Sequence, residues 1–81
     1  MLKKRILDLL IEIGEIDDEI NSYDMDLIET DVLDSLMIAQ LIGAIEEEFN
    51  IEEIDAEDIN EDNFKSINSI VKLLRKYGLE D

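Results

Sequence analysis

One serine is the centre of the chemistry that this sequence suggests, and it stands in the tripeptide Asp34-Ser35-Leu36. The chain has no histidine and no cysteine, so no imidazole can activate Ser35 and no thiolate can act as a nucleophile. The neighbouring Asp34 is a carboxylate, and carboxylates are weak bases near neutral pH. We therefore interpret the Ser35 hydroxyl as the substrate of an external enzyme. We expect no catalytic residue in this chain and predict that it is not an enzyme.

Helices are the elements that must position this serine. Apolar residues recur at helical spacing in several segments, and no segment alternates as a strand does. The sequence predicts an all-α fold, a small four-helix bundle of three main helices and one short one, in a single domain spanning residues 1–81. Ser66 is the expected N-cap of the last helix. The expected helices are 2–13, 35–49, 55–59 and 66–77, with a long loop at 14–34.

Ser35 begins the second predicted helix, and this position supports two interpretations. Serine is a favoured N-cap residue, whose hydroxyl accepts a hydrogen bond from a backbone amide. A helix start also presents unpaired N–H groups and the positive end of the helix dipole. A phosphate attached to the Ser35 hydroxyl would be stabilised there, so the position suits a phosphodiester.

The second predicted helix has apolar residues on two faces. The arc that contains Leu41 and Ile45 is expected to face the core. The opposite strip combines apolar, small and acidic residues, and Ala39 and Gly43 would let a partner approach the helix axis closely. We interpret this strip as a docking surface. Its residues are Leu36, Met37, Ala39, Gln40, Gly43, Glu46 and Glu47.

The rest of the apolar pattern predicts the core and the attachment of the loops. Leu27-Ile28 and Val32-Leu33 are expected to anchor the long loop, and Ile54 and Ile59 the short helix. The expected core residues are Ile6, Leu9, Leu10, Ile13, Ile38, Leu41, Ile45, Phe49, Phe64, Ile67, Ile70 and Leu74.

The formal charge of −16, from 23 acidic and 7 basic residues, bears on partners. Nucleic acid is disfavoured as a ligand because its binding relies on Lys and Arg, whereas a basic protein surface is a natural partner. Asp8 and Glu12 interrupt the first apolar run, so we predict neither a signal peptide nor a membrane span. We expect a cytoplasmic monomer.

The acidic segment 55–66 does not match a calcium-binding EF-hand loop. Ile59 stands at the fifth position, Asn60 replaces the required glycine at the sixth, and Ser66 replaces the glutamate at the twelfth. We therefore predict no metal site.

Three segments together resemble the acyl carrier protein family: Val-Leu-Asp-Ser-Leu at 32–36, Ile-Glu-Glu-Glu-Phe at 45–49 and Phe-Lys-Ser-Ile at 64–67. The resemblance covers residues 24–77. It implies that Ser35, between Asp34 and Leu36, carries 4′-phosphopantetheine, which a separate, magnesium-dependent phosphopantetheinyl transferase takes from coenzyme A.

The resemblance also implies a function and a set of partners. The thiol of the arm would hold acyl or aminoacyl groups as thioesters. A ligase or adenylation enzyme would load them, and synthases or transferases with basic docking patches would use them. Fatty acid, polyketide, nonribosomal peptide and D-alanyl pathways remain open. The alternative is an acidic helical interaction module without a prosthetic group, in which Ser35 is only a helix cap.

Two departures from the family pattern bear on pathway and on geometry. Met37 and Gln40 stand where carriers of bacterial fatty acid synthesis usually have acidic residues, and Leu33 before Asp-Ser is more typical of stand-alone D-alanyl, peptidyl or polyketide-type carriers. Asp31 and Val32 replace a common glycine. Aspartate tolerates the left-handed backbone conformation that glycine adopts easily, and valine tolerates it poorly.

Overall fold

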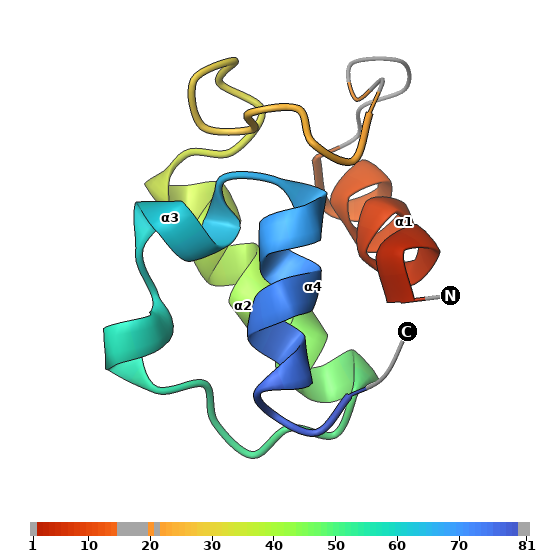
Figure 1. The fold of residues 1–81 in the computed structure, drawn as a ribbon, viewed down its shortest axis with the longest axis vertical. Coiled ribbons are helices and arrows are strands. Elements are labelled where there is room, and N and C mark those ends of the chain that lie inside the picture. The colour runs from red at the N-terminus through yellow and green to blue at the C-terminus, as the bar shows by residue number, and fades with distance from the viewer. Residues whose placement is uncertain (1, 15–19, 21, 80–81) are drawn as a thin grey trace.

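The structure, a computed structural model, describes residues 2–14, 20 and 22–79. Residues 15–19 and 21 of the predicted loop lie outside the described residues. The described part is helical without strands, which confirms the predicted all-α class. The elements are α1 (Leu2–Gly14), α2 (Ser35–Glu48), a 3-10 helix (Ala56–Asp58), α3 (Glu61–Phe64) and α4 (Ile67–Arg75), and they are labelled in Figure 1.

The segment between α2 and α4 differs most from the prediction. The short helix predicted at 55–59 is present as the 3-10 helix, and the separate helix α3, which the sequence pattern did not reveal, follows it. The Asn60 side chain caps α3 by accepting a hydrogen bond from the Asn63 N–H at 2.9 Å, and Phe64 at its end is fully buried. A four-residue helix is too short to show helical periodicity, so only its cap and its buried aromatic ring mark it.

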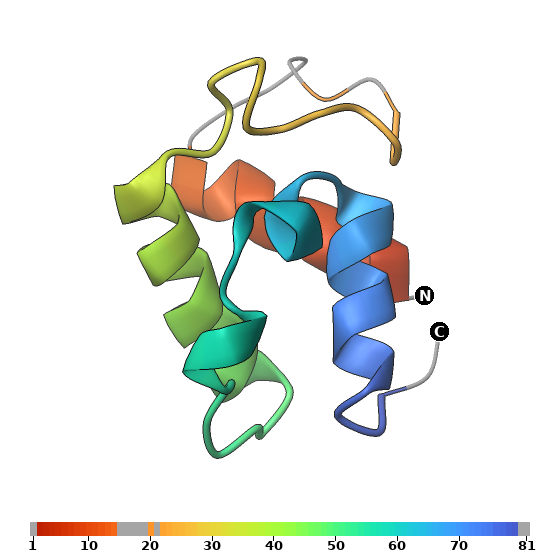
Figure 2. The same cartoon turned by 60° about the vertical axis from the view of Figure 1, so that its left-hand side comes forward.

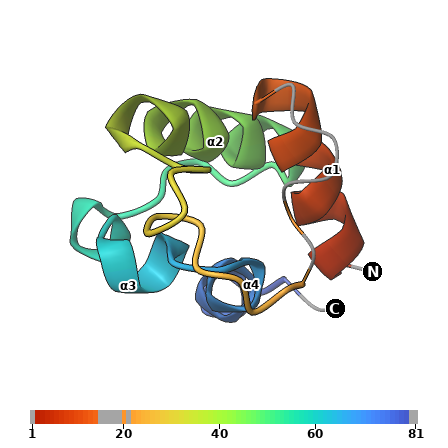
Figure 3. The same ribbon diagram turned by 90° about the horizontal axis from the view of Figure 1, so that it is seen from above.

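Three helices enclose the core. α1 packs against both α2 and α4, and α3 packs against α4. Figure 2 shows α2 and α4 on opposite sides of the bundle, with α3 between them in this view and α1 crossing behind, and from above α1, α2 and α4 surround one centre (Figure 3). Each fully buried Leu, Ile or Phe side chain contributes about 1.5–3 kcal/mol. The residues at the centre of the core include Ile6, Leu10, Leu41, Ile45, Phe64, Ile67, Ile70 and Leu74.

Some of the residues expected in the core lie at the edge of the core or outside it. Leu9, Ile13, Ile38 and Phe49 are only partly buried. The prediction for Ile59 is wrong, because its side chain is 40% exposed, whereas Ile54 is buried as expected. The helix that Ile59 was to anchor ends before it, so its side chain has no helical face that directs it inward.

The second half of the long loop crosses one end of the bundle and is bonded to the junction of α3 and α4. Leu27 and Leu33 are buried, which confirms the expected anchors. The Leu27 N–H donates to the Lys65 carbonyl at 2.6 Å, and the Asn68 N–H donates to the Tyr23 carbonyl at 3.0 Å. The Leu33 N–H closes the loop on the Leu27 carbonyl at 2.8 Å. These bonds fix the point at which the chain enters α2.

A polar cluster ties the α2–α3 connection to the end of α4 at the opposite end of the bundle. The Tyr77 hydroxyl donates to Asp58 Oδ2 at 2.8 Å and accepts from the Asp55 N–H at 2.9 Å. Lys76 Nζ lies 3.0 Å from Asp58 Oδ1. The hydrogen bond from Tyr77 and the bond and charge of Lys76 lower the pKa of Asp58. We call these four residues the Tyr77 cluster.

Candidate functional site

The turn that leads into α2 is formed by aspartates. Asp26 Oδ1 accepts hydrogen bonds from the N–H groups of Ile28 and Glu29 at 3.1 and 2.8 Å. Asp31 has a φ of 62°, in the left-handed region. A short polar side chain makes this conformation accessible to aspartate. Val32 has no positive φ, so the turn places its unusual conformation on the residue that tolerates it.

Asp34, rather than Ser35, is the N-cap of α2. Its backbone is extended, with φ −117° and ψ −175°, and its Oδ1 accepts a hydrogen bond from the Met37 N–H at 2.9 Å. The interpretation of Ser35 as the helix cap is therefore wrong. The physical reason is register: the bond from the Ile38 N–H to the Asp34 carbonyl, at 2.9 Å, makes Ser35 the first helical residue.

This register frees the Ser35 hydroxyl. Ser35 is exposed, and among the described residues its hydroxyl has no hydrogen-bond partner. A cap serine would be less reactive because its oxygen would be engaged with a backbone amide. Ser35 instead stands at the N-terminal end of a 14-residue helix, where a phosphate ester is favoured by the helix dipole and the first N–H groups. The residues present therefore fit a serine-linked phosphodiester.

Five residues of the predicted docking strip lie on the exposed side of α2. They are Leu36, Ala39, Gln40, Gly43 and Glu47. Leu36 is 67% exposed, the most exposed of the large apolar side chains among the described residues. A Cβ added at Gly43 would meet no atom within 4 Å, so the surface above the helix axis is open there.

The other two residues of the predicted strip are partly engaged in the fold. Met37 is half-buried and packs against the core cluster. Glu46 is half-buried as well, and its Oε2 accepts a hydrogen bond from the Ile54 N–H at 3.0 Å. Glu46 therefore satisfies the backbone of the α2–α3 connection, a role that the helical wheel could not reveal.

Two further properties of the described residues bear on the class of site. No group of three or more His, Cys, Asp or Glu side chains among them is arranged to hold a metal ion. Within the same residues, none of the helices has the length and apolar character needed to cross a membrane.

Comparisons with known proteins agree on one family. The model of the phosphopantetheine attachment site family matches residues 4–74, a range that contains the start of α2. The chain is also similar to an acyl carrier protein of Buchnera aphidicola subsp. Baizongia pistaciae (strain Bp), with 38% identity over 77 residues that cover 94% of each chain. No solved structure matches the chain significantly.

Proposed function

Because the chain belongs to the phosphopantetheine attachment family of acyl carrier proteins, whose prosthetic group is covalently bound 4′-phosphopantetheine, we propose that Ser35 is the attachment residue. The observation that carries the proposal is the division of roles at the start of α2. Asp34 caps the helix, and the exposed Ser35 hydroxyl has no partner among the described residues. The family match argues against the alternative of an interaction module without a prosthetic group.

The chain supplies an acceptor for the arm and no catalytic group. Attachment joins the Ser35 oxygen to the phosphate of the arm while the pyrophosphate bond of coenzyme A breaks and adenosine 3′,5′-bisphosphate leaves. The hydroxyl proton of Ser35 must pass to a base. The chain contains no histidine, and the neighbours of Ser35 are Asp34 and Leu36, so we propose that the transferase supplies that base. The bound arm supplies a thiol that holds acyl or aminoacyl groups as thioesters.

The role of the protein itself is then presentation. The family interacts with transferases and synthases in general. For this chain we infer a phosphopantetheinyl transferase, a loading ligase or adenylation enzyme, and synthases or transferases of fatty acid, polyketide, nonribosomal peptide or D-alanyl type. Glu46 is the least available residue of the docking strip because it bonds Ile54. We also propose that the protein is a cytoplasmic monomer, because a monomer leaves this strip free to contact such partners. The strip consists of Leu36, Met37, Ala39, Gln40, Gly43, Glu46 and Glu47.

Intact mass after incubation with coenzyme A, magnesium and a broad-specificity phosphopantetheinyl transferase tests the proposal. We expect one arm per chain for the wild type and none for Ser35→Ala. Ser22→Ala is the matched control, since Ser22 is also exposed and lies outside α2. An arm on Ser35→Ala would contradict the assignment of the residue. Failure of the wild type to load, while another carrier protein loads in the same assay, would contradict the carrier function.

A further inference from the structure

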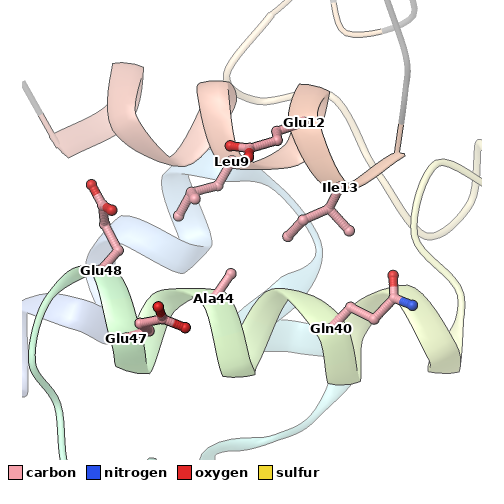
Figure 4. Close-up of a pocket in the computed structure, with 7 residues that line it drawn as sticks. All are labelled: Leu9, Glu12, Ile13, Gln40, Ala44, Glu47 and Glu48. Carbon is pink, nitrogen blue, oxygen red and sulfur yellow. The ribbon is translucent and has the colours of Figure 1, made fainter.

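An open groove lies between α1 and α2. Its volume is about 620 Å³, within the range of sites that bind ligands or side chains. Figure 4 shows Leu9 and Ile13 directed from α1 toward α2, and Ala44 directed back toward α1. These side chains give the groove an apolar floor. The full lining is Leu9, Glu12, Ile13, Gln40, Ala44, Glu47 and Glu48.

Two carboxylates on the rim of this groove lack a cationic partner. Glu12 and Glu47 are exposed, and neither forms an ion pair with any described residue. Their own helices cannot supply one, because no Lys or Arg stands three or four residues before or after either of them. The groove is therefore apolar at its floor and carries uncompensated negative charge on both walls.

The third carboxylate of the groove shows which kind of side chain suits this pattern. Arg5 Nη2 lies 2.8 Å from Glu48 Oε2, and the Arg5 guanidinium lies 4.4 Å from the centre of the Phe49 ring. A long basic side chain thus rests on an apolar surface and ends at a carboxylate, as such side chains commonly do. The rest of the groove also combines an apolar surface with carboxylates, but no Lys or Arg among the described residues forms an ion pair with Glu12 or Glu47.

We propose that the α1–α2 groove is a second docking surface, which binds a basic amphipathic helix of a partner protein. The aliphatic stems of its lysine or arginine residues lie on Leu9, Ile13 and Ala44, and their charged ends meet Glu12 and Glu47. Charge complementarity favours this occupant over an acidic or neutral one. The surface is continuous with the predicted docking strip through Gln40 and Glu47, so one partner can contact both. The proposal does not depend on the arm.

Titration of the unmodified protein with a synthetic amphipathic helical peptide of lysine and leucine tests the inference. At low ionic strength we expect amide chemical-shift changes concentrated in the second half of α1 and around Ala44. The double substitution Glu12→Gln/Glu47→Gln should weaken binding about five- to tenfold, the loss of two partly exposed ion pairs. The matched control, Glu52→Gln/Glu53→Gln, removes two exposed charges elsewhere and should change the affinity less than about twofold.

A steric variant separates the groove from general attraction between opposite charges. Ala44→Phe fills the floor without changing charge and should abolish binding, while arm loading at Ser35 persists. Circular dichroism checks that each variant keeps its helices. Equal weakening by the two charge variants, shifts confined to α2 with none in the second half of α1, or no binding would each overturn the proposal. None of these results would affect the assignment of Ser35, which is read from arm loading.

Discussion

The two ends of the bundle use their polar side chains in different ways. At the start of α2, Asp26 and Asp34 satisfy backbone amides, and the neighbouring Ser35 hydroxyl is left exposed. In the Tyr77 cluster, the polar groups satisfy one another: the Tyr77 hydroxyl both donates to Asp58 and accepts from the backbone of Asp55. An available hydroxyl thus depends on neighbours that cap the backbone in its place.

The two ends are also held in place by different contacts. The loop before α2 is anchored by buried leucines and by main-chain bonds to the α3–α4 junction, so the position of Ser35 depends on the core. The α2–α3 connection is anchored by buried Ile54 and by side-chain bonds from Glu46 and Tyr77. Damage to the first anchor should affect function, and damage to the second should affect stability alone.

Truncation of the two anchors gives the largest expected effect. Leu33→Ala and Ile54→Ala each remove a buried aliphatic side chain and should each lower the free energy of unfolding by about 2–5 kcal/mol, measured by urea denaturation. Only Leu33→Ala should also slow arm loading at Ser35, assayed at a low temperature where both variants are folded. Equal loading rates for the two variants would show that the loop anchor does not position the serine.

Removal of the α2 cap should have an intermediate effect. Asp34→Ala leaves the Met37 N–H without its partner and should cost about 0.5–2 kcal/mol of stability. Asp34→Asn is the matched control, because asparagine is an equally good cap and should preserve most of that stability. If Asp34→Ala were as stable as the wild type, the Ser35 hydroxyl would have replaced Asp34 as the cap, and loading should then slow.

Tyr77→Phe should have the smallest effect, and it should depend on pH. The lowered pKa of Asp58 means that its bonds stabilise the fold above the ordinary aspartate pKa, and that this contribution is lost as the pH falls through the lowered value. Removing the Tyr77 hydroxyl removes the largest cause of that shift, so the variant should lose less stability on acidification than the wild type. Thermal melts between neutral and acidic pH measure this difference. If the melting temperatures of the wild type and Tyr77→Phe changed equally with pH, the role of the Tyr77 hydroxyl would be contradicted. Arm loading at Ser35 should be unchanged in this variant.

Local signals in the sequence were sufficient for the three main helices and several anchors, and they singled out Ser35 as the candidate residue. Helical periodicity predicted α1, α2 and α4, and Ser66 caps α4 as expected, accepting from the Ser69 N–H at 3.1 Å. Leu27 and Leu33 are buried as predicted, because apolar side chains in an acidic loop gain free energy by leaving water while the neighbouring carboxylates stay in it. These features depend on residues close together in the chain, so short-range physics determines them.

The tertiary structure decided which neighbour covers each face. Asp34 and Ser35 are both good caps, and the choice follows from where the anchored loop enters α2. A helical wheel gives the direction of Glu46 but cannot show that the Ile54 amide lies there. It likewise assigns Leu9 and Ile13 to the core, whereas the packing of α1 on both α2 and α4 leaves them along a groove. Periodicity specifies a face of a helix, and only the assembled bundle specifies what that face meets.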